Sequence, residues 1–323
     1  MGDNKPISHA GGKTAGVTEV PRRYYIAMNG EKTRIAVIGE VLWDVFPDST
    51  RLGGAPLNFA AHARRLGHEP LLVSAVGNDK LGAEALARIA ALGLDTTMID
   101  VSRHLETGTA RVDLGDGEHP AFTIVRPAAY DDVRLTGERL ERMAAWAPAA
   151  VYYGTLFASR EEGRATLLQL LDAIPHARRF YDINLRPGSD SPALVGELLG
   201  RAGVVKLNET ELEVVARSTG LPSEAQGFCR AGASRYGWTA ACVTFGSRGC
   251  AVLAGGEYAE APGCPVEVAD PVGAGDAFAA AFLHGLEEGW RAEEIARFAN
   301  RLGALVASRP GAIPEWSLAE IAG

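Results

Sequence analysis

Short apolar runs alternate with longer segments of helical spacing along most of this chain. The run Arg34–Gly39 is rich in β-branched residues, as expected of a central strand buried on both faces. The segment Pro56–Leu66 has its apolar residues at helical spacing and stops at Gly67. Because this alternation recurs toward the C-terminus, it predicts an α/β fold, with a mostly parallel central sheet covered by helices on both faces.

The individual elements follow from the same two periodicities. A hairpin is also predicted around Gly255-Gly256. The predicted helices are Pro56–Leu66, Lys80–Leu92 and residues 160–174, 191–200, 209–218, 223–236, 274–288 and 291–307. The predicted strands are Arg34–Gly39, Leu71–Val76, Thr96–Val101, Ala149–Tyr153, Phe180–Ile183, Val204–Leu207 and Ala241–Thr244.

Two parts of the chain depart from the alternation. Residues 1–31 are polar and lack periodicity, which predicts a flexible tail before a single domain over residues 32–323. Between Thr107 and Val125 the pattern changes to short β segments around Gly115-Asp116-Gly117, which indicates a hairpin. We expect β-rich insertions near 42–52 and 106–127 to form a small lid outside the main sheet.

Composition argues against several function classes. The formal net charge is −8 and no stretch is dense in Lys or Arg, so a nucleic-acid binder is not expected. No apolar run approaches the length of a membrane span. The four cysteines have no CxxC spacing and no secretory leader precedes them, which favours reduced thiols in the cytoplasm. The seven histidines form no HExxH motif, so a zinc site is not expected.

A glycine-rich helix start near the C-terminus is suited to phosphate chemistry. Gly273, Ala274 and Gly275 precede an alanine-rich apolar helix, where uncovered amides and the helix dipole attract an anion. Asp276 in the first turn could take a proton from an attacking hydroxyl, and Asp270 lies on the loop before it. An acid at this position can equally serve only to stabilise the helix, so the segment alone leaves both interpretations open.

Residues after the first strand and before the first long helix are suited to a sugar. The pair Gly53-Gly54 lets a ligand approach the backbone, and Asn58 can donate to and accept from hydroxyl groups. Asp44 lies just beyond the first strand, at the edge where open parallel sheets bind ligands. Each feature has an ordinary alternative. Gly53-Gly54 could form a plain loop, Asn58 could serve only to stabilise the helix start, and Asp44 could be a solvated acid.

Polar segments also close three later strands. They are Asp182–Pro187, Asn208–Glu211 and Thr244–Gly249. The last has the small residues of a phosphate-binding turn, although a hairpin turn has the same composition. Asn208 and Glu211 also fit a capping box at a helix start.

Two nucleotide-binding motifs are excluded. The dinucleotide fingerprint GxGxxG should follow the first strand, where the chain has Gly39-Glu40-Val41, and the similar start at Gly273 has bulky Phe278 at the third glycine position. Gly12-Lys13-Thr14 resembles the end of a P-loop, but Ile7 stands at its first glycine.

The order and spacing of these motifs resemble the PfkB (ribokinase-like) family of carbohydrate kinases. The resemblance runs from about residue 34 to the C-terminus, and within the family the chain is most similar to bacterial fructokinases. Tyr130 stands where fructokinases usually carry a tryptophan. The segments similar to the two family signatures are Gly53–Ala60, with Gly67 and Gly77 beyond it, and Asp270–Leu283. Those similar to fructokinases are Gly39–Asp44, Leu52–Phe59, Asp182–Arg186 and Lys206–Glu211.

The resemblance implies a three-layer α/β/α domain with a small β lid, and a role for each matching residue. Asp276 would be the catalytic base, and Gly273, Ala274 and Gly275 would form the anion hole. Asp270, with the loop Ser308–Gly311, would contribute to a monovalent cation site. The sugar-binding residues implied are Asp44, Gly54, Asn58, Arg126 and Arg186. The nucleotide-binding residues implied are Asn184, Asn208, Glu211, Thr244, Gly246, Gly249 and Asn300, with Glu211 also holding magnesium through water.

The activity implied is the transfer of the γ-phosphate of ATP, with Mg²⁺ and a monovalent cation such as K⁺, to a sugar primary hydroxyl. Fructose would become fructose 6-phosphate, and a homodimer through the lid is also implied. The alternatives are a 2-keto-3-deoxygluconate, ribose or nucleoside kinase of the same family, and a non-catalytic sensor. A carboxylate-bearing substrate would need arginine partners, for which Arg126 and Arg186 are the candidates. A sensor should have lost the base or the glycines, and Asp276, Gly273 and Gly275 are all present.

Overall fold

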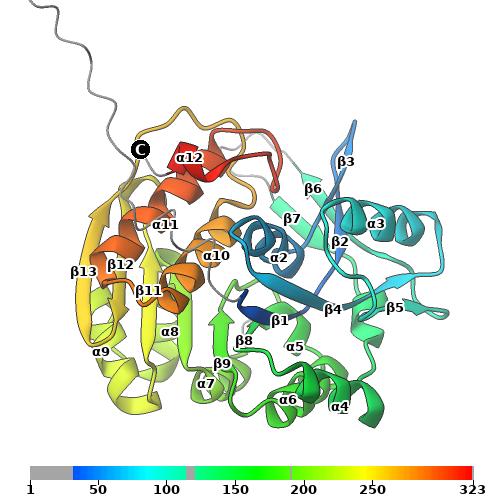
Figure 1. The fold of residues 1–323 in the computed structure, drawn as a ribbon, viewed down its shortest axis with the longest axis horizontal. Coiled ribbons are helices and arrows are strands. Elements are labelled where there is room, and N and C mark those ends of the chain that lie inside the picture. The colour runs from blue at the N-terminus through cyan, green and yellow to red at the C-terminus, as the bar shows by residue number, and fades with distance from the viewer. Residues whose placement is uncertain (1–31, 114–120, 190, 322–323) are drawn as a thin grey trace, which may run out of the picture.

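The computed structural model describes residues 32–113, 121–189 and 191–321. Their centre is a sheet in the order β13-β12-β11-β10-β9-β8-β1-β4-β5, with helices on both faces (Figure 1). Its pairs are parallel except β11–β12 and β12–β13, so the predicted fold class is confirmed. The strands are β1 (Arg34–Ile38), β4 (Glu69–Gly77), β5 (Ile99–Ser102), β8 (Ala150–Gly154), β9 (Arg178–Asp182), β10 (Val204–Asn208), β11 (Ala240–Thr244), β12 (Gly249–Ala254) and β13 (Glu257–Pro262).

The helices divide between two hydrophobic clusters, one on each face of the sheet. Helices α2, α3, α10 and α11 contribute to one cluster, and α4 to α9 contribute to the other. None of the helices in the described ranges is long and apolar enough to span a membrane. The helices are α2 (Ala55–Arg65), α3 (Lys80–Ala91), α4 (Gly137–Trp146), α5 (Thr155–Ala158), α6 (Glu161–Ala173), α7 (Pro192–Arg201), α8 (Glu209–Thr219), α9 (Ala225–Tyr236), α10 (Ala274–Glu287), α11 (Ala292–Ala307) and α12 (Leu318–Ile321), with short 3₁₀ turns η2 (Ala129–Asp132) and η3 (Gly246–Arg248).

A second, four-stranded sheet is built from the two β-rich insertions. Its order is β3-β2-β6-β7, with β2 (Leu42–Val45) parallel to β6 (Gly108–Asp113) and the other pairs antiparallel. The outer strands are β3 (Thr50–Gly53) and β7 (Ala121–Ile124). The turn predicted around Gly115-Asp116-Gly117 and the tail predicted over residues 1–31 lie outside the described residues.

Most predicted elements are confirmed, and the differences have local causes. Gly255 and Gly256 join β12 to β13 with positive φ at both residues, as a tight hairpin requires. The strand predicted from Thr96 begins only at Ile99, because Asp95 accepts a hydrogen bond from the Thr97 amide and makes a turn there. Helix α4 was not predicted. Only Met143 of this helix is buried, and charged residues make up much of its length, so it forms no apolar run, although its few apolar residues lie at helical spacing.

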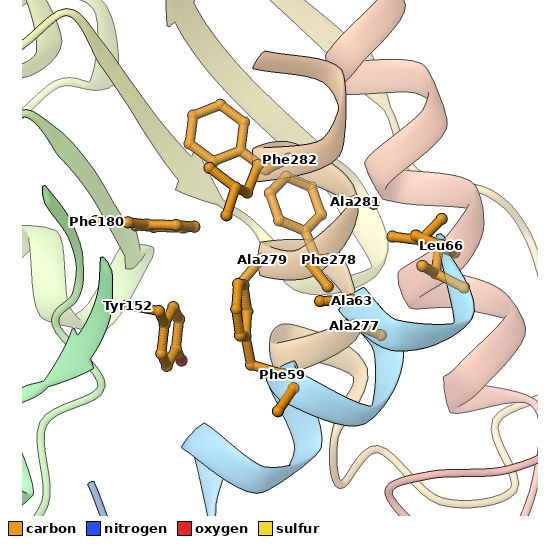
Figure 2. Packing of buried hydrophobic residues seen from close by; sticks show 14 of the residues in the cluster. Phe59, Ala63, Leu66, Tyr152, Phe180, Ala277, Phe278, Ala279, Ala281 and Phe282 are labelled. Atoms are coloured by element: carbon orange, nitrogen blue, oxygen red, sulfur yellow. The ribbon is translucent and has the colours of Figure 1, made fainter. Parts of the chain in front are cut away.

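The packing of α2 against α10 brings distant parts of the sequence to one edge of the sheet (Figure 2). The Phe59 ring on α2 stacks on Tyr152 of β8, with ring centroids 3.9 Å apart. Small residues of α10, Ala277 and Ala281 among them, are fully buried in the same cluster. Side chains this small allow the two helices to lie close together. The start of α10 is thereby placed near β1 and β8, between which the strand order reverses, where open α/β sheets bind ligands.

Candidate functional site

The start of α10 is an uncapped helix N-terminus. Gly273 occupies the N-cap position with φ of 83°, and no side chain caps the first turn. A Cβ atom at Gly273 would lie 2.5 Å from the Ala312 carbonyl oxygen, so both backbone conformation and space require glycine. The Ala274 amide donates to the Pro271 carbonyl at 3.4 Å, so the amides of Gly275 and Asp276 are the ones expected to bind an anion.

Asp276 lies in this first turn and is held by α2. Asn58 Nδ2 donates to Asp276 Oδ2 at 2.8 Å, while the buried Asn58 Oδ1 has no partner. Burial raises the pKa of Asp276 to about 6, and the hydrogen bond from Asn58 opposes the rise. Asp182 adds to the rise, whereas Lys206 opposes it. An acid with this pKa can be a carboxylate at neutral pH and still accept a proton readily.

A buried ion pair lies beneath the same helix start. Lys206 Nζ lies 2.8 and 3.0 Å from the two carboxylate oxygens of Asp182, and the Tyr152 hydroxyl donates to Asp182 at 2.9 Å. A Cβ atom at Gly275 would lie 3.7 Å from Lys206 Nζ, so the ammonium group is next to the predicted anion hole. Lys206 was not predicted as a site residue. Its position within the apolar run Val204–Leu207 could have indicated one, because a lysine buried in a strand needs an anionic partner.

Carboxylates after β1 and on β2 form the other side of the site. Burial raises the pKa of Asp44 to about 6, and Arg186 opposes the rise. Glu40, which was not predicted as a site residue, is also buried, and burial raises its pKa to about 7. A Cβ atom at Gly54, whose φ is 111°, would lie 2.4 Å from the Glu40 carbonyl oxygen. Gly54 thus lets the backbone of the α2 start pass directly over that of Glu40.

The two predicted arginines line a pocket of about 290 Å³ together with Ser159 and Ser189. Arg126 is committed to protein groups: it pairs with Asp131 and donates to the Leu156 carbonyl and the Ser159 hydroxyl. Arg186 donates through Nη1 to the Leu185 carbonyl at 3.1 Å. Its positive charge also lowers the pKa values of the acids across the site.

The predicted nucleotide residues gather at the ends of β10 and β11. Asn208 and Glu211 form a capping box at α8, and Glu211 also accepts from the Leu185 amide at 2.8 Å. Burial raises the pKa of Glu211, and Lys206 opposes the rise. Thr244 pairs directly with Asn208 across the parallel strands. These hydrogen bonds hold the Glu211 carboxylate in a fixed position, and the capping box expected from the sequence is present.

The remaining predicted residues shape the backbone of this region. Gly246 and Gly249 both have positive φ, and a Cβ atom at Gly249 would lie 2.0 Å from the Ala261 carbonyl oxygen. Asn184 also adopts a positive φ, of 41°, just beyond β9. Asn300 Nδ2 donates to the carbonyls of Ala261 and Pro262, which holds the end of β13 in place.

Asp270 lies at a junction of three segments. Its Oδ1 accepts from the Val272 amide at 3.1 Å, and its Oδ2 accepts from the Gly311 amide at 3.0 Å. Arg51 of β3 donates to the same Oδ2 atom and forms an ion pair with Asp270. Among the described residues, no three His, Cys, Asp or Glu side chains are grouped as metal ligands.

The chain is similar to known carbohydrate kinases over most of its length. The model of the pfkB family of carbohydrate kinases matches residues 26–318. A fructokinase of Klebsiella pneumoniae is 32% identical over 307 residues, covering 88% of this chain and 96% of the relative. A sugar kinase of Pyrococcus horikoshii, solved with ATP, is 26% identical with a TM-score of 0.74, covering 86% of this chain and 94% of its own. A 2-dehydro-3-deoxygluconokinase of Thermotoga maritima shares the fold at 18% identity, with a TM-score of 0.79 over 90% of this chain and 97% of its own.

Proposed function

Because this chain belongs to the pfkB family of carbohydrate kinases, we propose that it transfers the γ-phosphoryl group of ATP to a primary hydroxyl of a sugar, with fructose as the expected acceptor. The observation that carries the proposal is the position of Asp276. Its carboxylate lies at the uncapped start of α10 and is bonded to Asn58 of α2. A base and an anion site therefore meet at one point, as phosphoryl transfer requires.

The proposal assigns a separate role to each group of residues in the site. Asp276 would take the proton from the attacking hydroxyl while the first amides of α10 stabilise the phosphoryl oxygens. Asp44, Gly54 and Asn58 would hold the sugar, and the unpartnered Asn58 Oδ1 is an acceptor available to a sugar hydroxyl. Asn184, Thr244, Gly246, Gly249 and Asn300 would shape the ATP site. Phosphoryl transfer asks the protein mainly for such positioning and charge stabilisation.

Magnesium would neutralise charge on the ATP phosphates when bound. Mg²⁺ usually keeps several waters and is held by one or two carboxylates together with phosphate. Glu211 fits this role, because backbone amides fix its carboxylate while each oxygen retains a lone pair for a metal-bound water.

The proposal is tested by measuring ADP release with Mg²⁺ over a panel of ketoses, aldoses, nucleosides and keto-deoxy acids. We expect the highest kcat/KM with fructose. Turnover of a nucleoside without turnover of fructose would refute fructose as the acceptor but would not refute the kinase activity. No turnover of any acceptor would refute the kinase proposal.

The pH dependence of the reaction should report Asp276. With a pKa raised to about 6, this group is protonated and inactive as a base at lower pH. We expect kcat/KM for the sugar to be flat at alkaline pH and to fall by at least about tenfold per pH unit at acid pH, because Asp44, whose pKa is also raised to about 6, loses its charge in the same range. Steady-state rates from pH 5 to 9 at saturating ATP check this. A midpoint near 4, the usual value for an exposed aspartate, would contradict it.

The junction at Asp270 does not fit a monovalent cation at its carboxylate. The Oδ2 atom already accepts two hydrogen bonds, from Gly311 and from Arg51, and the Arg51 guanidinium supplies a positive charge there. We expect equal turnover in sodium, potassium and choline chloride at the same ionic strength. Arg51→Met removes the charge, so potassium should activate only that variant. Potassium activation of the wild-type protein would contradict the expectation.

Three further parts of the proposal concern the whole molecule. The four-stranded sheet would act as a lid over the sugar, because it carries Asp44 and packs Arg51 against Asp270. The four cysteines are all unpaired, which supports a reducing compartment such as the cytoplasm. A homodimer through the lid remains a prediction, and sedimentation of the purified protein tests it.

A further inference from the structure

The loop between α11 and α12, residues 308–317, packs directly on the start of α10. A Cβ atom at Gly273 would lie 2.5 Å from the Ala312 carbonyl oxygen and 2.6 Å from the Ala312 Cα atom, so the two backbones are in contact. The amides of Gly275 and Asp276, which are expected to bind an anion, follow Gly273 within three residues. Their direction therefore depends on where the α11–α12 loop holds Gly273.

Two side chains of α2 attach this loop to the helix. His62 Nε2 lies 3.0 Å from the Ala312 carbonyl oxygen, and Trp316 Nε1 lies 3.0 Å from His62 Nδ1. Arg65 donates to the Pro314 carbonyl at 2.5 Å, and its guanidinium lies over the Trp316 ring. The loop is thus held at Ala312, Pro314 and Trp316, and the carbonyl oxygen that His62 holds is the one beside the start of α10.

The two contacts of the His62 ring fix its protonation state. An indole N–H can only donate a hydrogen bond, and a carbonyl oxygen can only accept one. His62 must therefore carry its proton on Nε2, keep a lone pair on Nδ1 and be uncharged. Burial lowers the pKa of His62 to about 4, which agrees with a neutral ring at physiological pH.

The same helix holds the proposed catalytic base. Asn58 and His62 are four residues apart on α2 and so lie on one face of the helix. Asn58 donates to Asp276 at 2.8 Å, while His62 holds the loop against Gly273. One helix thus fixes both the carboxylate that would take the proton and the backbone that leads to the anion-binding amides. The rate of phosphoryl transfer depends on the relative position of two such parts.

We infer that His62 is a positioning residue for phosphoryl transfer, which holds the Ala312 carbonyl against Gly273 through its Nε2 proton. The inference rests on the proposed kinase function. Because His62 is fully buried, it acts through the loop and not by contact with sugar or ATP. Loss of its bond to Ala312 should therefore lower kcat and leave the KM values for sugar and ATP nearly unchanged.

Two amide variants separate the two hydrogen bonds of the ring. In His62→Gln the amide nitrogen is as many bonds from Cγ as the imidazole Nε2 atom, so it can still donate to Ala312. In His62→Asn the amide lies at the position of Nδ1, where its oxygen can accept from Trp316 but its nitrogen does not reach Ala312. We expect kcat with saturating ATP and sugar to fall by at least about tenfold in His62→Asn and to stay within about threefold of the wild-type value in His62→Gln.

Thermal unfolding shows how far each variant is destabilised, and we expect a similar loss in both. His68→Asn is the matched control, since His68 is also a buried histidine and its Nε2 atom lies 3.0 Å from Nδ1 of His284. This control should lose stability and keep the wild-type kcat.

The outcomes separate the two proposals. If the wild-type protein phosphorylates no acceptor, the kinase proposal fails and the inference about His62 fails with it. If the wild-type protein is active but His62→Asn keeps its kcat, or both His62 variants lose kcat equally, only the inference about His62 fails. Should His62→Asn not fold, nitrogen NMR of the histidine-labelled wild-type protein tests the bond instead. His62 should carry its proton on Nε2 and stay neutral from about pH 5 to pH 8, and a proton on Nδ1 would overturn the inference.

Discussion

Replacing Asp276 with Asn is expected to lower kcat by at least about 10²-fold while the protein folds normally. The amide cannot accept the proton of the attacking hydroxyl, yet it has nearly the same shape and its oxygen can still accept the hydrogen bond from Asn58. Burial raises the pKa of Asp276, so its charge is unfavourable in the folded state at neutral pH. We therefore expect the variant to be at least as stable as the wild-type protein.

The measurement is steady-state kcat with saturating ATP and sugar, together with thermal unfolding at pH 8. Asp172→Asn, an exposed acid on α6, is the matched control and should leave both quantities unchanged. Turnover of Asp276→Asn near the wild-type value would show that Asp276 is not the catalytic base. A large loss of stability would show that the carboxylate serves the fold.

Replacing Lys206 with Met is expected to destabilise the protein by about 3–5 kcal/mol, because it leaves a buried charge on Asp182 without its cation. Burial alone would lower the pKa of Lys206, but Asp182 and Glu211 hold it above its usual value, so the lysine is charged. Among the described residues, only the Tyr152 hydroxyl would still donate a side-chain hydrogen bond to Asp182. Urea unfolding at pH 7 measures the loss.

The double variant Asp182→Asn/Lys206→Met separates the charge from the packing. Replacing both members of a buried ion pair is often neutral, so most of the lost stability should return. We expect kcat to be low in both the single and the double variant, since each lacks the positive charge beside Gly275. A double variant no more stable than Lys206→Met would show that the two side chains do not act as a pair.

Much of this site could be predicted from the sequence, because the positions of its glycines and of some of its acids are determined by the local backbone conformation. Gly273, Gly54 and Gly249 all adopt positive φ, a backbone conformation that selects glycine whatever surrounds it. The capping box of Asn208 and Glu211 is likewise contained within one helical turn. Helix α4 was missed although Leu140, Met143 and Trp146 lie three residues apart, as on one face of a helix.

Partners that lie far apart in the chain could not be predicted in this way. Asn58 and Asp276 are separated by 218 positions and meet only because α2 packs against α10. Lys206 and Asp182 meet because β10 lies beside β9 in the sheet. Glu40 lies in the segment Gly39–Asp44 that is similar to fructokinases, but its burial depends on how deeply the tertiary structure covers the end of β1.

The helix start at Asp276 illustrates which features the sequence determines and which depend on the tertiary structure. By itself the sequence determined that a glycine-rich turn with Asp270 before it and Asp276 within it begins an apolar helix, because these features depend on neighbouring residues. Only the tertiary structure decided that Asp270 is neutralised by Arg51 whereas Asp276 faces Asn58 with a raised pKa. The two carboxylates are chemically identical in the sequence. The partners of both carboxylates and the raised pKa of Asp276 depend on desolvation and on charges brought close by long-range packing.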